Sequence, residues 1–159
     1  MAFAETREND LYWMTKAYEL AQQAEQQGEV PVGAVLVDTE NQCIGEGWNQ
    51  PISAHDPTAH AEMIAITQAA EALRSWRLDG ATLYVTLEPC PMCAGAILLA
   101  RIPTVVYGAP DPKAGAVHSL YELLSDRRLN HRPQIVSDVL RGPCGEILTK
   151  FFQRKRCQS

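Results

Sequence analysis

The sequence has no long hydrophobic run, and none of its apolar stretches approaches the ~20 residues of a membrane helix. The first ten residues also lack the basic segment followed by an apolar stretch that marks a secretion signal. Cysteines are few and odd in number, at positions 43, 90, 93, 144 and 157, which argues against a disulfide framework. We therefore expect no membrane span, reduced thiols and a cytoplasmic location.

Internal repeats, low-complexity tracts and Ser/Gly-rich linkers are absent as well. With 46% hydrophobic and 21% charged residues, the composition lies in the globular range and excludes wholesale disorder. The length of 159 residues fits one domain of the usual ~100–200 residues. We predict that residues 1–159 form a single domain that ends in a basic helix.

Basic residues are outnumbered, 14 against 19 acidic ones, and the net charge of -5 by itself disfavours a polyanionic partner. The charge is unevenly distributed, however. Residues 1–126 carry 6 basic and 17 acidic side chains, whereas residues 127–159 carry 8 basic and 2 acidic ones. Such a basic final segment either holds a phosphate backbone or is a solvated terminal helix, and charge alone leaves both interpretations open.

Helical and extended patterns alternate along the chain, which predicts an α/β layered domain. The apolar spacing predicts helices over residues 9–27, 56–73, 89–99, 119–124 and 144–156, and strands over residues 32–37, 43–48, 81–87, 104–107 and 134–136. The first two strands should form a hairpin, and Asp56 followed by Pro57 has the form of a helix N-cap and first turn. Strands joined through helices should be parallel, with right-handed crossovers.

Three side chains form a pattern of metal ligands: His60, and then the pair Cys90 and Cys93. One imidazole and two thiolates suit zinc, and three protein ligands leave one position for water, as in catalytic sites. The alternative is half of a zinc ribbon, but the sequence has no second C-x-x-C pair. We expect both cysteines in the first helical turn after Pro89, where the helix dipole favours thiolates, and His60 at the start of a neighbouring helix.

Glu62 follows His60 by two residues and is the candidate general acid and base. Zinc lowers the pKa of a bound water towards about 7, and a nearby carboxylate can take its proton and pass it to a substrate. The alternative is an ordinary acidic residue that the helix dipole favours in a first turn. The two cysteines favour the catalytic interpretation.

The pattern H-x-E followed by P-C-x-x-C is the signature of zinc-dependent nucleobase deaminases. More of the chain resembles one branch of that group, the bacterial tRNA-specific adenosine deaminases (TadA family). The resembling stretches are residues 29–37, 45–49, 55–62, 81–96, 130–132 and 151–152. The resemblance implies a three-layer α/β/α cytidine deaminase-like fold, with a central mixed sheet of about five strands flanked by helices.

The resemblance also implies roles for matching residues. His60, Cys90 and Cys93 would hold one zinc ion per subunit, with Glu62 as the general acid and base. The residues implied to contact the substrate are Asn49 on the flipped base, the backbone of Ala61, Val32 and Leu87 in the base pocket, Asp111 beside the target, and Phe152, Lys155 and Arg156 in the terminal helix. In that helix basic side chains can hold phosphates and aromatic rings can stack on bases. The alternative is that Phe151 and Phe152 lie on the core face of an amphipathic helix.

The implied reaction is hydrolytic deamination of the wobble adenosine to inosine in a tRNA anticodon loop. The resemblance also implies a homodimer, and we expect no membrane partner. The adenine is unstacked into the pocket, activated water attacks C6, Glu62 relays protons, and ammonia leaves. Two alternatives remain open from the sequence. One is a deaminase of a free base or nucleoside such as guanine or cytosine, with the same zinc site. The other is a non-catalytic RNA-binding or zinc-stabilised module.

Overall fold

The computed structural model describes residues 2–158, and its centre is a five-stranded mixed sheet with the strand order β2-β1-β3-β4-β5. The strands are β1 (Gly33–Val37), β2 (Cys43–Trp48), β3 (Thr82–Leu87), β4 (Thr104–Ala109) and β5 (Gln134–Val136). The helices are α1 (Ala2–Gln26), α2 (Pro51–Ala54), α3 (Ala61–Leu73), α4 (Pro91–Ala100) and α5 (Arg141–Gln158), with a short 3-10 helix η1 (Leu123–Ser125).

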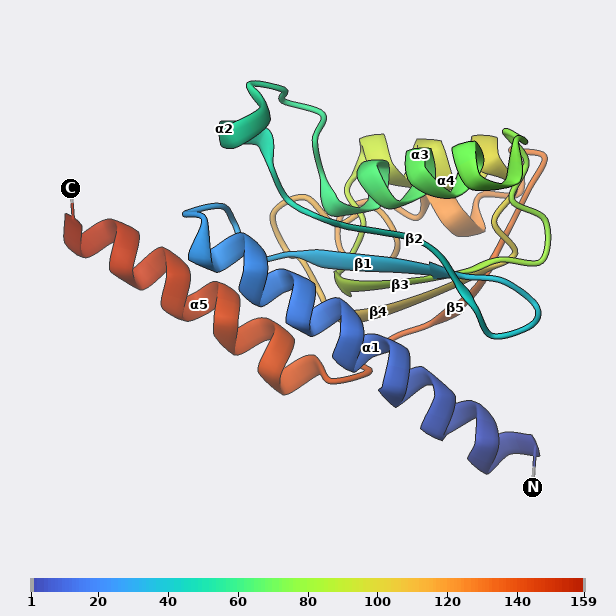
Figure 1. The fold of residues 1–159 in the computed structure, drawn as a ribbon, viewed down its shortest axis with the longest axis horizontal. Coiled ribbons are helices and arrows are strands. Elements are labelled where there is room, and N and C mark those ends of the chain that lie inside the picture. Colours follow the sequence, from blue (N-terminus) through green and yellow to red (C-terminus); the bar gives the residue numbers. More distant parts are fainter. Residues whose placement is uncertain (1, 159) are drawn as a thin grey trace.

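Helices cover both faces of the sheet, so the molecule has three layers. Helices α3 and α4 lie on one face, and α1 and α5 lie on the other (Figure 1). Each interface has its own apolar cluster, with Leu83 and Ile97 on the α3/α4 side and Met14 and Val35 on the α1/α5 side. This arrangement confirms the predicted α/β/α fold.

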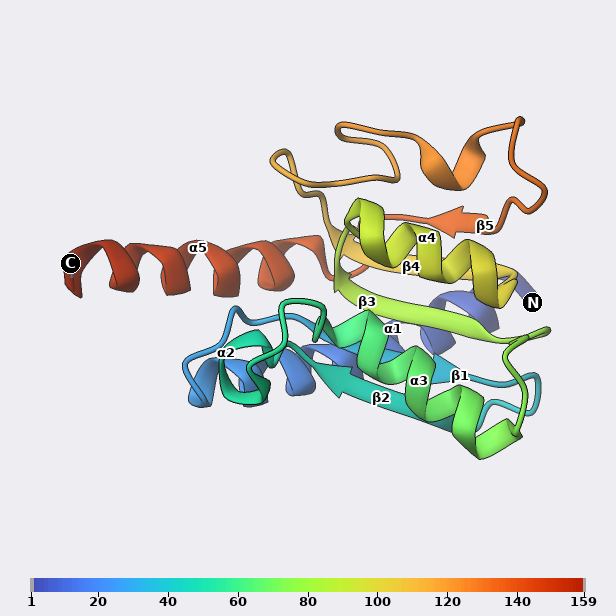
Figure 2. The ribbon, with the colours of Figure 1, turned by 90° about the horizontal axis from the view of Figure 1, so that it is seen from above.

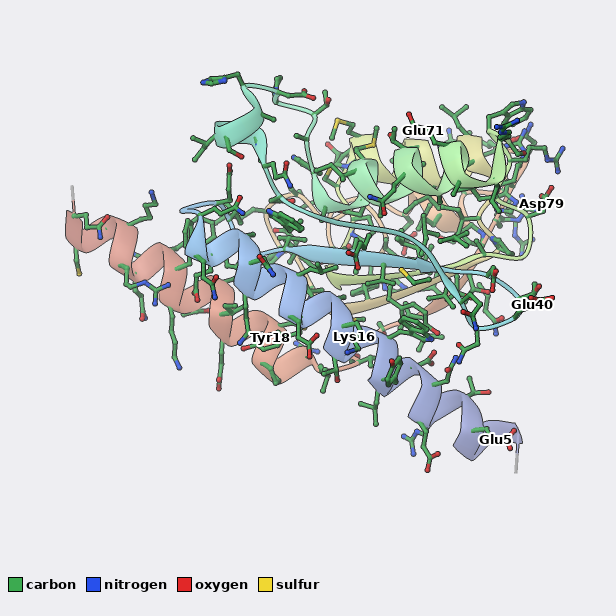
Figure 3. The ribbon with its side chains drawn as sticks, in the orientation of Figure 1. Glu5, Lys16, Tyr18, Glu40, Glu71 and Asp79 are labelled. Atoms are coloured by element: carbon green, nitrogen blue, oxygen red, sulfur yellow. The ribbon has the colours of Figure 1, made fainter. Side chains whose placement is uncertain are left out.

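Most charged side chains lie outside these layers, and the buried exceptions among the described residues are Glu29, Glu62 and Glu88. Glu5, Glu40, Glu71 and Asp79 are exposed and point away from the sheet (Figure 3). Among residues 2–158, no helix combines the length and the apolar character needed to cross a bilayer.

Strand directions bring several chain segments to one edge of the sheet. Strand β1 is antiparallel to both β2 and β3, whereas β3 is parallel to β4 and β4 to β5. The carboxyl ends of β2, β3 and β4 therefore share an edge with the amino end of β1. Helix α3 follows β2 and helix α4 follows β3, so both helices start at this edge (Figure 2). Crevices at the carboxyl ends of strands are the usual binding sites of open α/β sheets.

Small residues allow α3 to lie close against β2. The buried face of α3 is formed by Ala61, Ala65 and Ala69. A Cβ atom placed on Gly45 of β2 would lie 2.3 Å from the carbonyl oxygen of Ala65, so a side chain there would push the helix away. The start of α3 is thereby fixed relative to the sheet.

The sheet agrees closely with the sequence prediction, including the hairpin of β1 and β2. Helix boundaries differ more. Helix α1 begins at Ala2 instead of residue 9, α5 begins at Arg141 instead of residue 144, and the predicted helix at 119–124 is the 3-10 turn Leu123–Ser125. Helix α2 lies between the strand predicted at 43–48 and the helix predicted at 56–73, where the sequence predicts neither helix nor strand.

The two helices of the predicted metal site start later than expected. Helix α3 begins at Ala61, because Asp56 closes a local turn instead: its Oδ1 accepts from the Thr58 N–H at 2.9 Å and from the Thr58 hydroxyl at 2.7 Å. Helix α4 begins at Pro91, so Cys90 is its N-cap residue, with φ -77° and ψ 173°. The expectation that Asp56 caps α3 is therefore wrong.

Candidate metal centre and adjoining groove

His60, Cys90 and Cys93 meet where α3 and α4 begin. His60 is the N-cap of α3, with extended backbone at φ -76° and ψ 153°, and Cys90 is the N-cap of α4. His60 Nδ1 lies 3.5 Å from the Sγ atom of each cysteine, and the three donor atoms all lie within 4.8 Å of one another. Residues 33 positions apart in the chain thus form one compact donor set.

The donor set fits zinc. Ligands about 2.1 Å (nitrogen) and 2.3 Å (sulfur) from a tetrahedral zinc are themselves about 3.6 Å apart. The observed Nδ1–Sγ separations of 3.5 Å match that value. Among the described residues no further His, Cys, Asp or Glu joins this group, which leaves a fourth coordination position open. Such openness distinguishes catalytic zinc sites from structural ones.

The two thiols differ in acidity. Hydrogen bonds from Cys93 and from His60 lower the pKa of Cys90 to about 4. The hydrogen bond to Cys90 and burial raise the pKa of Cys93. A divalent cation deprotonates coordinating thiols outright, which makes this buried pair suited to a metal.

Glu62 is the second residue of α3 and is 4% exposed. Burial raises its pKa to about 7, although a backbone hydrogen bond and the charge of His60 act in the opposite direction. Its carboxyl group interacts with the side chain of Cys93, which places it beside the metal centre. A carboxyl group that titrates near neutral pH can both accept and donate a proton, as a general acid and base must.

Asn49 connects the metal centre to the strands. Its Oδ1 accepts from the Ala61 N–H at 2.8 Å, which caps the start of α3, and its own N–H donates to the Val32 carbonyl at 3.1 Å. Asn49 is 8% exposed, so this capping side chain is buried beside the start of α3. The Ala61 N–H therefore donates within the protein. Val32 is buried and immediately precedes β1.

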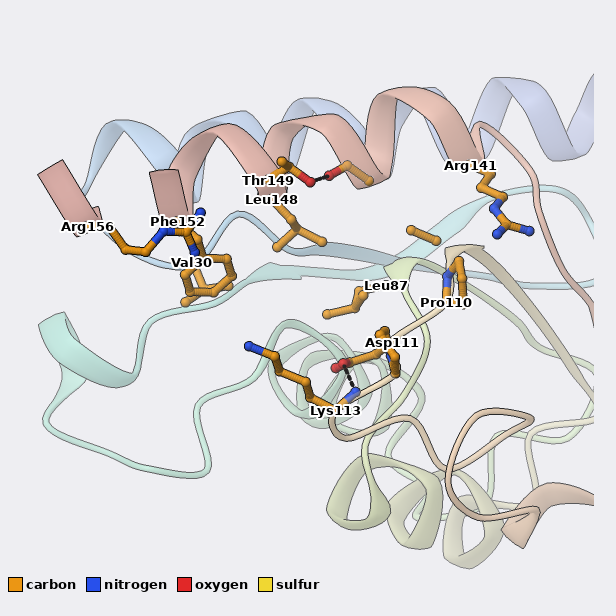
Figure 4. A pocket seen from close by; sticks show the side chains of 13 residues that line it. Val30, Leu87, Pro110, Asp111, Lys113, Arg141, Leu148, Thr149, Phe152 and Arg156 are labelled. Atoms are coloured by element: carbon orange, nitrogen blue, oxygen red, sulfur yellow. Dashed lines mark hydrogen bonds between the residues drawn. The ribbon is translucent and has the colours of Figure 1, made fainter. Parts of the chain in front are cut away.

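A groove of about 640 Å³ lies at the same edge of the sheet (Figure 4). Its lining residues are Val30, Leu87, Ala109, Pro110, Asp111, Pro112, Lys113, Arg141, Gly145, Leu148, Thr149, Phe152 and Arg156. The metal ligands are not in this lining, but Leu87, the last residue of β3, lies in it and precedes Cys90 by three residues.

The structure places only part of the predicted contact set in the groove. Leu87, Asp111, Phe152 and Arg156 line it, whereas Asn49, Ala61, Val32 and Lys155 do not. The Lys155 Nζ atom lies 5.6 Å from the ring centroid of Phe151, over a different side of the helix. The Asp111 Oδ1 accepts from the N–H groups of Lys113 and Ala114, at 3.0 and 3.2 Å, and so shapes its own loop.

Helix α5 contributes one complete face to the groove. Residues 141, 145, 148, 149, 152 and 156 are spaced as one stripe of an α-helix, and all of them line the groove. A neighbouring stripe, Cys144, Ile147 and Phe151, is buried against the rest of the fold. This spacing is the signal by which Arg141, Leu148 and Thr149 could have been found in the sequence. Val30 and Lys113 lie two residues from the predicted Val32 and Asp111.

The basic residues of the final segment are divided among several surfaces. Of the eight, Arg141 and Arg156 line the groove, where Lys113 joins them. Arg141 also pairs with Asp138 at 3.1 Å, Arg128 pairs with Asp126 at 2.7 Å, and Arg154 pairs with Glu25 of α1 at 2.7 Å. Phe151 is 6% exposed and belongs to the core, while Phe152 is 45% exposed and faces the groove.

Comparison with known proteins agrees with this geometry. A family model described as the cytidine and deoxycytidylate deaminase zinc-binding region matches residues 7–109, which include all three donors. The tRNA-specific adenosine deaminase of Haemophilus influenzae is 51% identical over 149 residues, or 94% of this chain and 86% of that protein. The tRNA-specific adenosine deaminase of Bacillus subtilis is 49% identical over 92% of this chain and 91% of that protein.

The chain belongs to the tRNA-specific adenosine deaminase family. A solved structure from a study of A-to-I editing by tRNA:A34 deaminases at the wobble position superposes with a TM-score of 0.83 and 45% identity, covering 86% of this chain and 99% of that one. A guanine deaminase from Bacillus subtilis superposes with a TM-score of 0.59 and 42% identity over 62% of this chain and 63% of that one. The expected family, fold and hydrolytic deaminase chemistry are confirmed.

We predict that Cys93→Ser protein retains less than about a tenth of the zinc bound by the unaltered chain, because a hydroxyl replaces one of three protein donors. The measurement is zinc content after dialysis against a weak chelator. The control is Cys43→Ser, since Cys43 is exposed and outside the donor set. Full zinc content in Cys93→Ser would contradict the assignment.

Proposed function

We propose that this chain deaminates the wobble adenosine of a tRNA anticodon loop to inosine by hydrolysis. One observation carries the proposal. The three-donor metal centre, with a buried carboxyl group beside it, lies at the same edge of the sheet as a groove lined by three basic side chains and an exposed aromatic ring. The centre supplies the means of deamination, and the groove supplies a surface for a nucleic-acid strand. The relatives named tRNA-specific adenosine deaminases support the same substrate.

We infer that His60, Cys90 and Cys93 hold one zinc ion per chain, and that residues 1–159 act as one deaminase domain. When bound, zinc supplies the Lewis acidity that activates a water molecule for attack on C6 of the base. Helix α3 fixes the imidazole and helix α4 fixes the two sulfurs, so the donors are preorganised by the fold.

Glu62 then moves the protons. Its carboxylate accepts a proton from the attacking water and delivers it to N1 of the purine ring, and the second proton of that water goes to the amine at C6 by the same route. The C6–N bond breaks, ammonia leaves and the carbonyl of inosine remains, so the reaction consumes one water.

The surrounding residues hold the substrate. The Asn49 side-chain NH₂ group donates to an acceptor on the flipped base, and Leu87 supplies apolar contact at the mouth of the groove. Phe152 offers an exposed ring on which a neighbouring base can stack, and cations along the groove attract phosphates. Lys155 lies outside this set.

A deaminase of a free base is the second candidate, and the guanine deaminase of known structure favours it by 42% identity over 62% of this chain. A free base would make no use of the length of a groove that extends along helix α5 to Arg156. The extended lining therefore favours an oligonucleotide.

We further propose that the chain forms a homodimer and acts in the cytoplasm. Leu99 of α4 and Trp76 after α3 are 72% and 67% exposed, and both line a shallow depression of about 570 Å³ on the outer helical face. Apolar side chains of this size at a shared patch favour contact with another protein surface. The five cysteines, all within the described residues, are free thiols, as a reducing compartment requires.

The zinc-loaded protein is expected to form inosine in an anticodon stem-loop with adenosine at the wobble position, and no product from free adenosine, cytosine or guanine. Product is measured by nucleoside mass spectrometry. In the same assay Glu62→Gln is expected to lower kcat by about 10²–10⁴-fold while zinc content is retained. Deamination of a free base alone would exclude the RNA substrate, and full turnover in Glu62→Gln would exclude the role of Glu62.

Replacing Arg156 by Gln is expected to weaken stem-loop binding and to reduce the slope of log Kd against log salt by about 0.7, because one phosphate contact is lost. The matched control is Lys150→Gln, on the same helix but outside the groove. Both quantities are measured by fluorescence anisotropy from low to moderate salt. Equal effects of the two substitutions would show that the groove does not guide the RNA backbone.

The Leu99→Glu protein is expected to be monomeric under conditions in which the unaltered chain has twice its sequence mass of 17.6 kDa, since a buried charge would oppose association. Light scattering after size exclusion measures the mass. Leu11→Glu, at an exposed site on α1, is the control and should remain dimeric. A monomeric unaltered chain at micromolar concentration would refute the homodimer.

A further inference from the structure

Glu88 is a buried carboxylate that the proton transfers above do not use. It follows Leu87, the last residue of β3, and precedes the metal donor Cys90 by two positions. Its side chain is only 2% exposed. A charged group this deeply buried requires several hydrogen-bond donors to offset the loss of water.

Five donors converge on the Glu88 carboxylate, and all of them come from one loop. Oε1 accepts from the Asp111 N–H at 3.0 Å and from the Ser119 hydroxyl at 2.5 Å. Oε2 accepts from three successive N–H groups, those of Val117, His118 and Ser119, at 2.9–3.0 Å. Successive N–H groups that point at one oxygen form an anion-binding concavity, so the loop is shaped around this carboxylate.

The packing between loop and carboxylate is as close as the hydrogen bonding. A Cβ atom placed on Gly115 would lie 2.3–2.5 Å from the carboxyl atoms of Glu88, so only glycine fits there. The backbone continues the attachment on both sides, because the Glu88 N–H donates to the Ala109 carbonyl at 2.9 Å and the Ala116 N–H donates to the Pro89 carbonyl at 2.8 Å.

The same loop forms one wall of the groove. Pro110, Asp111, Pro112 and Lys113 line it, opposite the face of α5 (Figure 4). Glu88 therefore joins the turn that carries Cys90 to the wall that the RNA would contact. Asp111 is attached to Glu88 by a single hydrogen bond, from its backbone N–H to Oε1, at the edge of the groove.

We propose that Glu88 is a positioning residue, which holds the groove wall 110–113 at a fixed place relative to the metal centre so that bound RNA presents its target base there. The proposal rests on the proposed RNA substrate. Glu88 touches neither the reacting atoms nor the metal, and it acts through the loop. Small displacements of a positioning group weaken the productive complex even when the chemical groups are intact.

Glutamine at position 88 separates this role from general packing, because it has nearly the same shape. If the amide oxygen takes the place of Oε2, the three N–H groups of residues 117–119 keep their acceptor. The NH₂ group then occupies the place of Oε1, where the Ser119 hydroxyl can turn round and accept from it. The Asp111 N–H cannot do so and is left facing another donor. Glu88→Gln therefore detaches the groove end of the loop selectively.

The test compares the unaltered chain with Glu88→Gln and Gly115→Ala, and uses Glu122→Gln, at an exposed position nearby, as the control. Zinc content and backbone amide exchange are measured by metal analysis and NMR, and kcat and KM are measured on the anticodon stem-loop. For Glu88→Gln we expect unchanged zinc, about tenfold or more faster exchange at Asp111 with little change at Val117, and a KM raised about tenfold with a smaller change in kcat. For Gly115→Ala, which pushes the loop away without changing any charge, we expect a raised KM and faster exchange across the loop.

Unchanged Asp111 exchange and unchanged KM in Glu88→Gln would overturn the proposal, as would loss of zinc together with a fall in kcat alone. If Glu88→Gln does not fold, Gly115→Ala keeps the carboxylate and displaces the loop from it, and a KM equal to that of the unaltered chain would then count against the role. If the unaltered chain deaminates no RNA, the proposed function fails. The exchange data would still decide whether Glu88 holds the loop.

Discussion

The structure depends on one topological constraint: two helices must begin side by side at the edge where β2 and β3 end. That constraint brings the imidazole of His60 to 3.5 Å from both sulfurs, although 30 and 33 residues separate them in the chain. The small residues between α3 and β2 serve it, because a single methyl group at Gly45 would displace the helix that carries His60. The groove shares the constraint, since its loop wall follows the neighbouring strand β4.

Three buried glutamates show how the same side chain is adapted to different tasks. Burial by itself acts to raise the pKa of all three carboxyl groups. For Glu29 and Glu88, hydrogen bonds outweigh burial: Ser53 and Ile52 donate to Glu29, and Ser119, His118 and Asp111 donate to Glu88, whose pKa falls to about 2. Both remain ionised and tie loops to the framework. For Glu62 burial prevails and raises the pKa to about 7. The number of backbone N–H donors thus separates structural carboxylates from the proposed catalytic one.

Much of this arrangement is predictable from the sequence. Alternating patterns locate all five strands to within about two residues at each end, because strand length and turn residues leave little freedom. Helix starts are predicted less well. The Asp56-Pro57 pair has the composition of an N-cap, but its side chain closes a turn on Thr58, and the cap of α3 comes from the distant Asn49. Local sequence cannot reveal a cap supplied by a residue 12 positions earlier in the chain.

By itself the sequence determined the layered fold, the donor set and the candidate carboxylate, because residue type and spacing carry the chemistry of zinc and of proton transfer. The tertiary structure decided which cations share a surface. Helix periodicity places Arg141 and Arg156 along one face with Phe152, directs Lys155 over Phe151, and leaves Arg154 to pair with Glu25. It also decided the place of Glu88, whose five donors are 23 to 31 residues away in the chain. Contacts over such separations arise only when the sheet has assembled.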